Sequence, residues 1–369
     1  MGFDLPFRPR ITRRRRGPDF FANFRAALTP AMRGEVDFVL HGGDLLYRSK
    51  VPAGLVEMAM APLLEVAGRG VPVYIVPGNH ERSRIPLQLW TDHENIHIFD
   101  RPRTFQLRQN GTSVALSGFP FVRRAREGFV KTLEATGFRE STADLRLLCL
   151  HQVVEGAQVG AADFTFRGGP DVIRGVDIPG EFAAVLCGHI HRAQILRSGL
   201  NGHALAAPVI YPGSIERTSV AERHEEKGYY LLTFRDNDSE GGSLCDRDAG
   251  GRPLNEESTG ETCLRDIGTG VSHFDATFKR LPARPMAKLV LNDVDLNGGS
   301  LDRLLDKRLR ALDPESVVRV SLNGPVVREA AAALNARRLR EITPPTMNVS
   351  LSPDTWRDKS ARPSHGGAR

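Results

Sequence analysis

The chain has 369 residues, of which 40% are hydrophobic and 25% are charged, and its formal net charge is +6. These values are ordinary for a globular protein with one large and one small domain, and no apolar run approaches the roughly 20 residues of a membrane-spanning helix. Four cysteines without a Cys-x-x-Cys pair form neither a zinc-ligand spacing nor a disulfide framework, so we expect a cytoplasmic location. The basic charge is compatible with a polyanionic partner.

The first part of the chain predicts a strand, a helix and a second strand. Residues 36–41 are an apolar run that leads through two glycines to Asp44. A helix is predicted over residues 53–67, and a buried strand over 71–76 leads to Asn79. Such a unit predicts two parallel strands, whose carboxyl ends meet at one edge of the sheet. We therefore expect the Asp44 and Asn79 side chains to lie at the same edge.

Two later strands also end in side chains that bind metals. His151 follows the apolar run 145–150, and His189 and His191 follow the run 182–187. Each histidine alone would be an ordinary polar residue. Four strand ends that carry Asp, Asn-His, His and His-x-His in this order instead predict one shared site.

The remaining elements divide the chain into domains. We predict a β-hairpin over 103–118 with an Asn-Gly turn, a basic helix within 122–142 and a strand over 227–234. The predicted divisions are a first domain (1–234), a flexible loop or linker (235–284), a small α/β domain (285–352) and a disordered tail (353–369). The small domain is predicted to contain strands 287–291, 316–322 and 347–351 and helices 300–312 and 328–342.

The set of strand-end residues predicts a two-metal phosphoesterase. Carboxylate, amide oxygen and imidazole groups suit manganese, iron or zinc better than calcium. A hydroxide held between two metals about 3.5–4 Å apart attacks phosphorus in line in such sites. We expect His80 to protonate the leaving oxygen. We expect Asp44 to bridge the metals and His191 to belong to one of them. The ligands expected to complete the other metal are Asn79, His151 and His189.

Weaker predictions concern residues around this site. We expect Glu81 to orient His80 or a ligand through a hydrogen bond, and His41 to pack behind the site. Tyr211, Ser214 and Arg217 are candidate substrate contacts, although a structural turn explains the first two almost as well.

The motifs carry a resemblance to a known family. They resemble the motif series of the calcineurin-like metallophosphoesterases over about residues 1–234. Within that superfamily the chain is similar to the SbcD-type DNA repair exonucleases. The segments that carry the resemblance are Gly43-Asp44-Leu45-Leu46, Gly78-Asn79-His80-Glu81, His151, Gly188-His189-Ile190-His191, residues 211–217, Lys227-Gly228-Tyr229 and the small α/β domain.

The resemblance implies a fold, an activity and partners. The implied fold is a two-layer αββα sandwich with a small C-terminal α/β capping domain. The implied activity is metal-dependent exonuclease or endonuclease action on DNA ends in double-strand-break repair, with two Mn²⁺ ions. The implied partners are DNA, a coiled-coil SbcC-type ATPase and a second copy of the chain.

Two departures from the family pattern modify these expectations. The family opens with Asp-x-His at the tip of its first strand, whereas this sequence starts with Met1-Gly2-Phe3-Asp4. We therefore expect the first strand to be missing and the first metal site to be incomplete, through a start codon placed too far downstream or a truncated chain. The family's ATPase-docking segment follows the capping domain, and only residues 353–369 remain here.

Two alternatives stay open beside the DNA nuclease. One is a small-molecule metallophosphatase or phosphodiesterase on the same scaffold, against which the capping domain argues. The other is a non-catalytic protein that binds DNA or a partner, because the Asp-x-His motif is missing.

Overall fold

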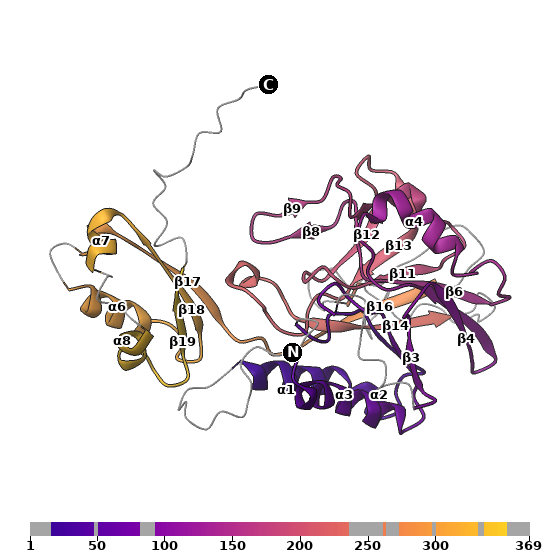
Figure 1. The fold of residues 1–369 in the computed structure, drawn as a ribbon, viewed down its shortest axis with the longest axis horizontal. Coiled ribbons are helices and arrows are strands. Elements are labelled where there is room, and N and C mark those ends of the chain that lie inside the picture. The colour runs from indigo at the N-terminus through magenta and orange to yellow at the C-terminus, as the bar shows by residue number, and fades with distance from the viewer. Residues whose placement is uncertain are drawn as a thin grey trace, which may run out of the picture. The chain divides into compact units, whose positions relative to one another are not determined.

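The computed structural model describes most of the chain, which folds into two compact units (Figure 1). The described residues are 16–47, 51–81, 93–235, 261–262, 273–296, 300–330 and 336–352. Of these, the first unit contains those within 16–217 and 224–283, and the second contains 218–223 and those from 284 onward. Within the described ranges, no helix combines the length and the apolar character needed to cross a membrane.

The first layer of the first unit consists of helices on a small parallel sheet. The helices are α1 (Gly17–Ala27), α2 (Thr29–Met32) and α3 (Ala53–Ala67), and the sheet has the order β1 (Val39–His41), β2 (Val73–Ile75) and β3 (Ile96–Ile98). Apolar residues at helical spacing on α3 bury one face against the sheet. The predicted helix 53–67 and the predicted parallel strand pair are both confirmed.

The second layer is a six-stranded mixed sheet. Its order is β12 (Gln194–Ser198), β13 (Ala204–Tyr211), β11 (Ala184–Cys187), β6 (Leu145–Leu150), β5 (Thr112–Gly118) and β4 (Arg103–Gln109). Asn110 and Gly111 join β4 to β5 with φ angles of 50° and 90°, which confirms the predicted hairpin turn. The central strands β6 and β11 are parallel and buried along their whole length except at Arg146.

Short elements surround this sheet. They are α4 (Ala125–Glu134), β7 (Val153–Val154), β8 (Gln158–Val159), β9 (Phe164–Thr165), β10 (Val172–Ile173) and the 3₁₀-helix η2 (Gly175–Asp177). The predicted basic helix within 122–142 corresponds to α4, which is shorter.

A third sheet corrects the predicted linker. Strand β14 (Gly228–Arg235) pairs antiparallel along its whole length with β16 (His273–Arg280), and β15 (Glu261–Thr262) adds a short third strand. The prediction that residues 235–284 form a flexible linker is therefore wrong for β16. Phe274 and Ala276 alternate with polar residues on β16 and are buried, a period-two pattern that the polar composition of the region concealed. Residues 236–260 and 263–272, and the predicted tail 353–369, lie outside the described residues.

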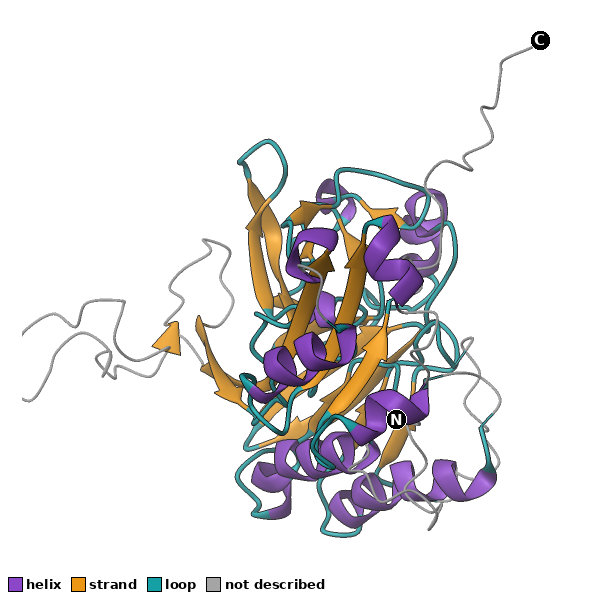
Figure 2. Cartoon of the chain, turned by 90° about the vertical axis from the view of Figure 1, so that its left-hand side faces the viewer, coloured by secondary structure: helices purple, strands orange, loops and turns teal. Residues whose placement is uncertain are grey.

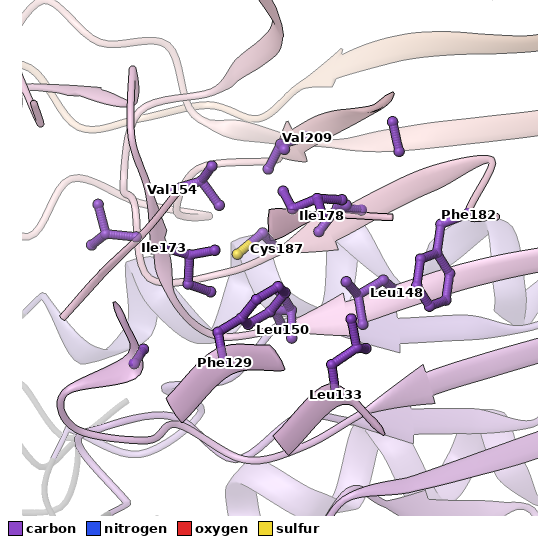
Figure 3. Close-up of a cluster of buried hydrophobic side chains, with 14 of the residues drawn as sticks. Phe129, Leu133, Leu148, Leu150, Val154, Ile173, Ile178, Phe182, Cys187 and Val209 are labelled. Atoms are coloured by element: carbon purple, nitrogen blue, oxygen red, sulfur yellow. The ribbon is translucent and has the colours of Figure 1, made fainter. Parts of the chain in front are cut away.

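Three apolar clusters hold the layers of the first unit together. One joins α1, α2 and α3 to the first sheet, and a second fills the space between the sheets, where Phe99 packs against Phe105. The third joins α4 to the six-stranded sheet, and Figure 3 shows Phe129 and Leu133 directed toward β6. Figure 2 distinguishes the helices, strands and loops of the chain by colour. This order of helix, sheet, sheet and helix confirms the predicted α/β fold class.

The two described cysteines lie on opposite faces of the six-stranded sheet. Cys149 belongs to the cluster between the sheets, and Cys187 belongs to the cluster under α4. Both thiols are free, and burial raises the pKa of Cys187 to about 12. These two residues therefore pack as small apolar side chains.

The second unit contains a parallel three-stranded sheet. Its strands are β17 (Met286–Asn292), β18 (Val317–Asn323) and β19 (Asn348–Leu351), and its helices are α5 (Asp293–Leu296), α6 (Leu301–Arg310), α7 (Pro325–Ala330) and α8 (Ala336–Glu341). The 3₁₀-helix η3 (Val220–Glu222) belongs to this unit as well. Leu301, Leu305 and Leu309 form the buried stripe of α6. The three predicted strands are observed, and the predicted helix 328–342 corresponds to α7 and α8, between which residues 331–335 lie outside the described part.

Candidate metal centre

The carboxyl ends of four strands bring the predicted metal ligands together. Asp44 follows β1, Asn79 follows β2, His151 follows β6 and His189 follows β11. The first two strands belong to one sheet and the other two belong to the sheet packed on it. The site therefore depends on the packing of the two sheets against each other, and not on one strand pair alone.

Four ligand atoms converge at this point. Asn79 Oδ1 lies 3.1 Å from His151 Nε2 and 2.9 Å from His189 Nδ1. The two imidazole nitrogens are 3.2 Å apart, and Asp44 Oδ2 lies 3.3 Å from His151 Nε2. Asp44, His151 and His189 form a group that could hold a metal ion.

The spacing and chemistry of these atoms fit a divalent metal. With metal–ligand bonds of about 2.1 Å, neighbouring ligands are about 3.0 Å apart in an octahedral site and about 3.4 Å apart in a tetrahedral one. The observed separations of 2.9–3.3 Å lie in this range. One carboxylate, one amide oxygen and two imidazoles match the ligand preferences of manganese, iron and zinc.

A hydrogen bond behind His151 fixes which of its nitrogens faces the cluster. His151 Nδ1–H donates to the carbonyl oxygen of Gly42 at 2.6 Å, and the side chain is 1% exposed. A neutral imidazole carries one proton, so Nε2 presents its lone pair to the other three ligand atoms. Metal-binding histidines are commonly oriented in this way.

Two of the four residues have strained backbones. Asp44 has φ 56° and His189 has φ 80°, both in the left-handed region that favours glycine. Such conformations cost about 1–3 kcal/mol each and persist only when the surroundings enforce them. The two loops that carry Asp44 and His189 must therefore be held by specific contacts.

Glu81 supplies such contacts for the Asp44 loop. Its carboxylate accepts hydrogen bonds from the backbone N–H groups of Gly78 at 2.7 Å, Leu46 at 2.8 Å and Asp44 at 3.1 Å. The side chain is 1% exposed, and burial raises its pKa. The contacts that the structure shows thus join Glu81 to the backbone around Asp44 and not to the His80 imidazole.

His80 lies at the open side of the cluster. Its Nδ1–H donates to the carbonyl oxygen of Tyr47 at 2.9 Å, and its Nε2 lies 3.8 Å from Asp44 Oδ2. Its backbone N–H donates to Asp44 Oδ1 at 3.0 Å, and half of its side chain is exposed. A side chain in this position can meet a substrate from solvent.

The other two predicted histidines lie outside the four-atom cluster. His41 Nδ1 accepts a hydrogen bond from the Gly43 N–H, and its ring packs edge-on against Phe24. A supporting role of His41 behind the site stays a prediction. Among the described residues, His191 does not belong to the group formed by Asp44, His151 and His189. It is nevertheless near enough to contribute to lowering the pKa of His189. Burial is the largest cause of that shift, which brings the pKa of His189 to about 4.

The structure corrects the predicted substrate contacts. The Tyr211 side chain is fully buried, and its hydroxyl donates to the Gln152 carbonyl and accepts from the Val154 N–H. The prediction that Tyr211 faces substrate is therefore wrong. Ser214 Oγ donates to the Glu216 carbonyl, and Arg217 donates to the Glu225 carbonyl, so these side chains have intramolecular roles. A substrate contact by Ser214 or Arg217 stays a prediction.

Sequence patterns did not identify one aromatic neighbour of the centre. The ring of Phe121 lies 5.7 Å from that of His189 and 6.2 Å from that of His151. The backbone N–H of Phe121 donates to the Pro77 carbonyl. The carbonyl of the next residue, Val122, accepts a hydrogen bond from Gln152 Nε2. Phe121 follows β5, which is parallel to β6 and ends at the same edge. Its place at the end of a strand that shares this edge is the signal that could have identified Phe121 from the sequence.

Comparisons with known proteins agree with this geometry. Residues 17–193 match the family described as calcineurin-like phosphoesterase. A DNA double-strand break repair protein Mre11 from Methanocaldococcus jannaschii is 26% identical over 60% of this chain and 58% of its own length. An uncharacterized metallophosphoesterase, YhaO of Bacillus subtilis, is 28% identical over 59% of this chain and 50% of its own length.

A longer match covers most of the chain. The Mre11 protein of Archaeoglobus fulgidus is 25% identical over 89% of this chain and 67% of its own length. The matches to the first two relatives span only about half of their lengths, 58% and 50%. From the matched family and the convergence of the four strand ends, we conclude that residues 17–193 form a calcineurin-like phosphoesterase domain.

Proposed function

We propose that the protein is a metal-dependent nuclease that hydrolyses phosphodiester bonds at DNA ends in double-strand-break repair. The observation that carries this proposal is the convergence of four ligand atoms within 3.3 Å of their neighbours, with the half-exposed His80 beside them. The Mre11 names of several relatives support DNA as the substrate. The net charge of +6 agrees with a polyanionic substrate.

In this proposal the four-atom cluster holds a divalent metal. The residues that hold it are Asp44, Asn79, His151 and His189. A bound divalent metal supplies Lewis acidity at phosphate oxygens and lowers the pKa of water. His151 contributes Nε2 because Gly42 holds its Nδ1 proton. We propose Mn²⁺ as the metal, with His191 as a ligand of a second ion.

His80 is the proposed proton donor. Its Nδ1–H is held by the Tyr47 carbonyl, so any proton given to substrate leaves from Nε2. Asp44 Oδ2 lies 3.8 Å from Nε2, so this nitrogen stands beside the four-atom cluster. A protonated Nε2 at the open side of the cluster can donate to the leaving oxygen of a broken phosphodiester.

The proposed setting follows from the family resemblance. We propose that the protein acts in the cytoplasm, as a homodimer, with a coiled-coil SbcC-type ATPase as partner. The matches to proteins named as DNA double-strand break repair proteins support the repair setting of this proposal.

The test measures DNA cleavage and metal binding on the same preparations. Metal-free protein is titrated with Mn²⁺ and then incubated with end-labelled linear duplex and single-stranded DNA. We expect shortening of the DNA, and we expect His80→Ala to abolish it without loss of bound Mn²⁺. His203→Ala, a change at an exposed loop histidine, is the matched control and should leave cleavage unchanged.

Three results would contradict the proposal in different ways. Activity on small phosphoesters with none on DNA would favour a small-molecule phosphatase. Bound Mn²⁺ without hydrolysis of either substrate class would favour a non-catalytic protein. Full cleavage by His80→Ala would remove His80 from its proposed role.

A further inference from the structure

The loop after β11 carries a strained residue, and its contacts converge on one carbonyl group. His189 has φ 80°, and two residues later the backbone oxygen of His191 accepts hydrogen bonds from two separate segments. One donor is the Ser214 N–H at 3.1 Å, and the other is Lys227 Nζ at 2.8 Å. The conformation of this loop is therefore fixed from outside the loop.

Lys227 is buried and charge-compensated. Its side chain is 0% exposed, and its ammonium lies 3.1 Å from Glu225 Oε2, a carboxylate that is itself 8% exposed. The other oxygen of Glu225 lies 3.4 Å from Arg192 Nε, and Arg192 also pairs with Asp163 at 2.7 Å. Burying a charge is costly without partners. This network therefore indicates that an ammonium has a specific role at position 227.

A close backbone approach explains why the second donor comes from residue 214. Gly213 has φ 77°, and a Cβ atom there would lie 2.8 Å from the His191 oxygen and 2.8 Å from the Ala193 nitrogen. Only glycine allows the turn to pack this closely on the loop. The Ser214 N–H in this turn and the buried Lys227 ammonium thus donate hydrogen bonds to the same carbonyl oxygen from two segments.

The two strained ligand loops are held by buried charges of opposite sign. Glu81 accepts backbone N–H groups around Asp44, and Lys227 donates to a backbone carbonyl beside His189. Each charge matches the polarity of the backbone groups that it holds.

We propose that Lys227 is a positioning residue of the metal centre, which sets the metal affinity by holding the His189 loop in its strained conformation through the His191 carbonyl. This inference rests on the proposed metal centre, and it adds a residue that acts on that centre through the backbone.

The test compares metal affinity with stability in the metal-free protein. Lys227→Met keeps an unbranched side chain of nearly the same length and removes the ammonium, while Glu225 keeps its contact with Arg192. The double variant Lys227→Met with Glu225→Gln removes both charges of the pair and guards against failure of the single variant to fold. Lys131→Met, on the exposed face of α4, is the matched control.

We expect the dissociation constant of Mn²⁺, measured by calorimetry, to rise at least tenfold in both Lys227 variants and to stay unchanged in Lys131→Met. A residue that only stabilises the fold would lower the Tm of the metal-free protein and leave the metal affinity as it was. Wild-type affinity in a folded Lys227 variant, or failure of both variants to fold, would overturn the inference. Absence of Mn²⁺ binding by the wild-type protein would instead overturn the metal centre and the inference with it.

Discussion

Gly78→Ala tests whether the site depends on close packing of its loops. The Cβ of an alanine at this position would lie 2.2 Å from Asp44 Oδ1, 2.6 Å from the Asp44 nitrogen and 2.8 Å from His151 Cε1. Gly78 has no left-handed φ, so the substitution introduces a clash without a backbone penalty. Asp44 must move away from the added Cβ by about 1 Å to restore a normal van der Waals distance between them.

The size of this shift sets the expected loss. Metal sites tolerate displacements of only about 0.5 Å, so we expect the Mn²⁺ dissociation constant to rise about 100-fold. The overpacked loop should also lower the free energy of unfolding by about 1–3 kcal/mol. Gly54→Ala is the matched control, because nothing lies within 4 Å of its added methyl group in α3.

The assay is calorimetric titration of metal-free protein with Mn²⁺, together with urea unfolding. Gly54→Ala should bind Mn²⁺ as the wild-type protein does. Wild-type Mn²⁺ affinity in a folded Gly78→Ala variant would refute the assignment of Asp44 and His151 to the centre.

Three further predictions follow from the contacts around the site. Glu81→Gln replaces one accepting oxygen by an N–H₂ group that faces backbone donors, and it should lower both Mn²⁺ affinity and the free energy of unfolding, the latter by about 2 kcal/mol in urea titrations. Tyr211→Phe leaves two buried backbone groups without their hydroxyl partner and should cost about 1–3 kcal/mol of stability. Its KM for a phosphoester substrate should not change, and a raised KM would restore Tyr211 as a substrate contact. Burial lowers the pKa of His41 and of His189 from 6.5 to about 4, so the unfolded chain binds more protons between these values and stability falls as pH falls. Between pH 7 and pH 5 the free energy of unfolding of the metal-free protein should fall by about 2 kcal/mol for each imidazole. If the free energy of unfolding of His41→Asn fell as steeply with pH as that of the wild-type protein, the contribution of His41 would be contradicted.

The elements that the sequence predicted well are those with a strong local period. Helix α3 and strand β6 occupy the predicted residues, because long apolar stripes and runs decide their structure. Strand β16 was missed because its alternating pattern lies beside a long polar segment. Composition averaged over 50 residues hides a strand of eight.

The candidate centre was predictable as a set of residue types and not as a set of contacts. Parallel strands place their carboxyl ends at one edge, so Asp44 and Asn79 could be paired from the chain order alone. Glu81 could not be assigned to the Asp44 backbone, because that contact depends on the φ of Asp44 and on the loop path. Tyr211 could not be recognised as buried, because its two partners come from another strand end.

The most direct test of the account is the location of a bound metal in a crystal. Crystals of the protein grown with Mn²⁺ would be measured at the manganese absorption edge. We predict an anomalous peak within bonding distance of Asp44 Oδ2, Asn79 Oδ1, His151 Nε2 and His189 Nδ1. A saturated crystal without a peak among these four atoms, or with its peak elsewhere on the chain, would contradict the proposed metal centre.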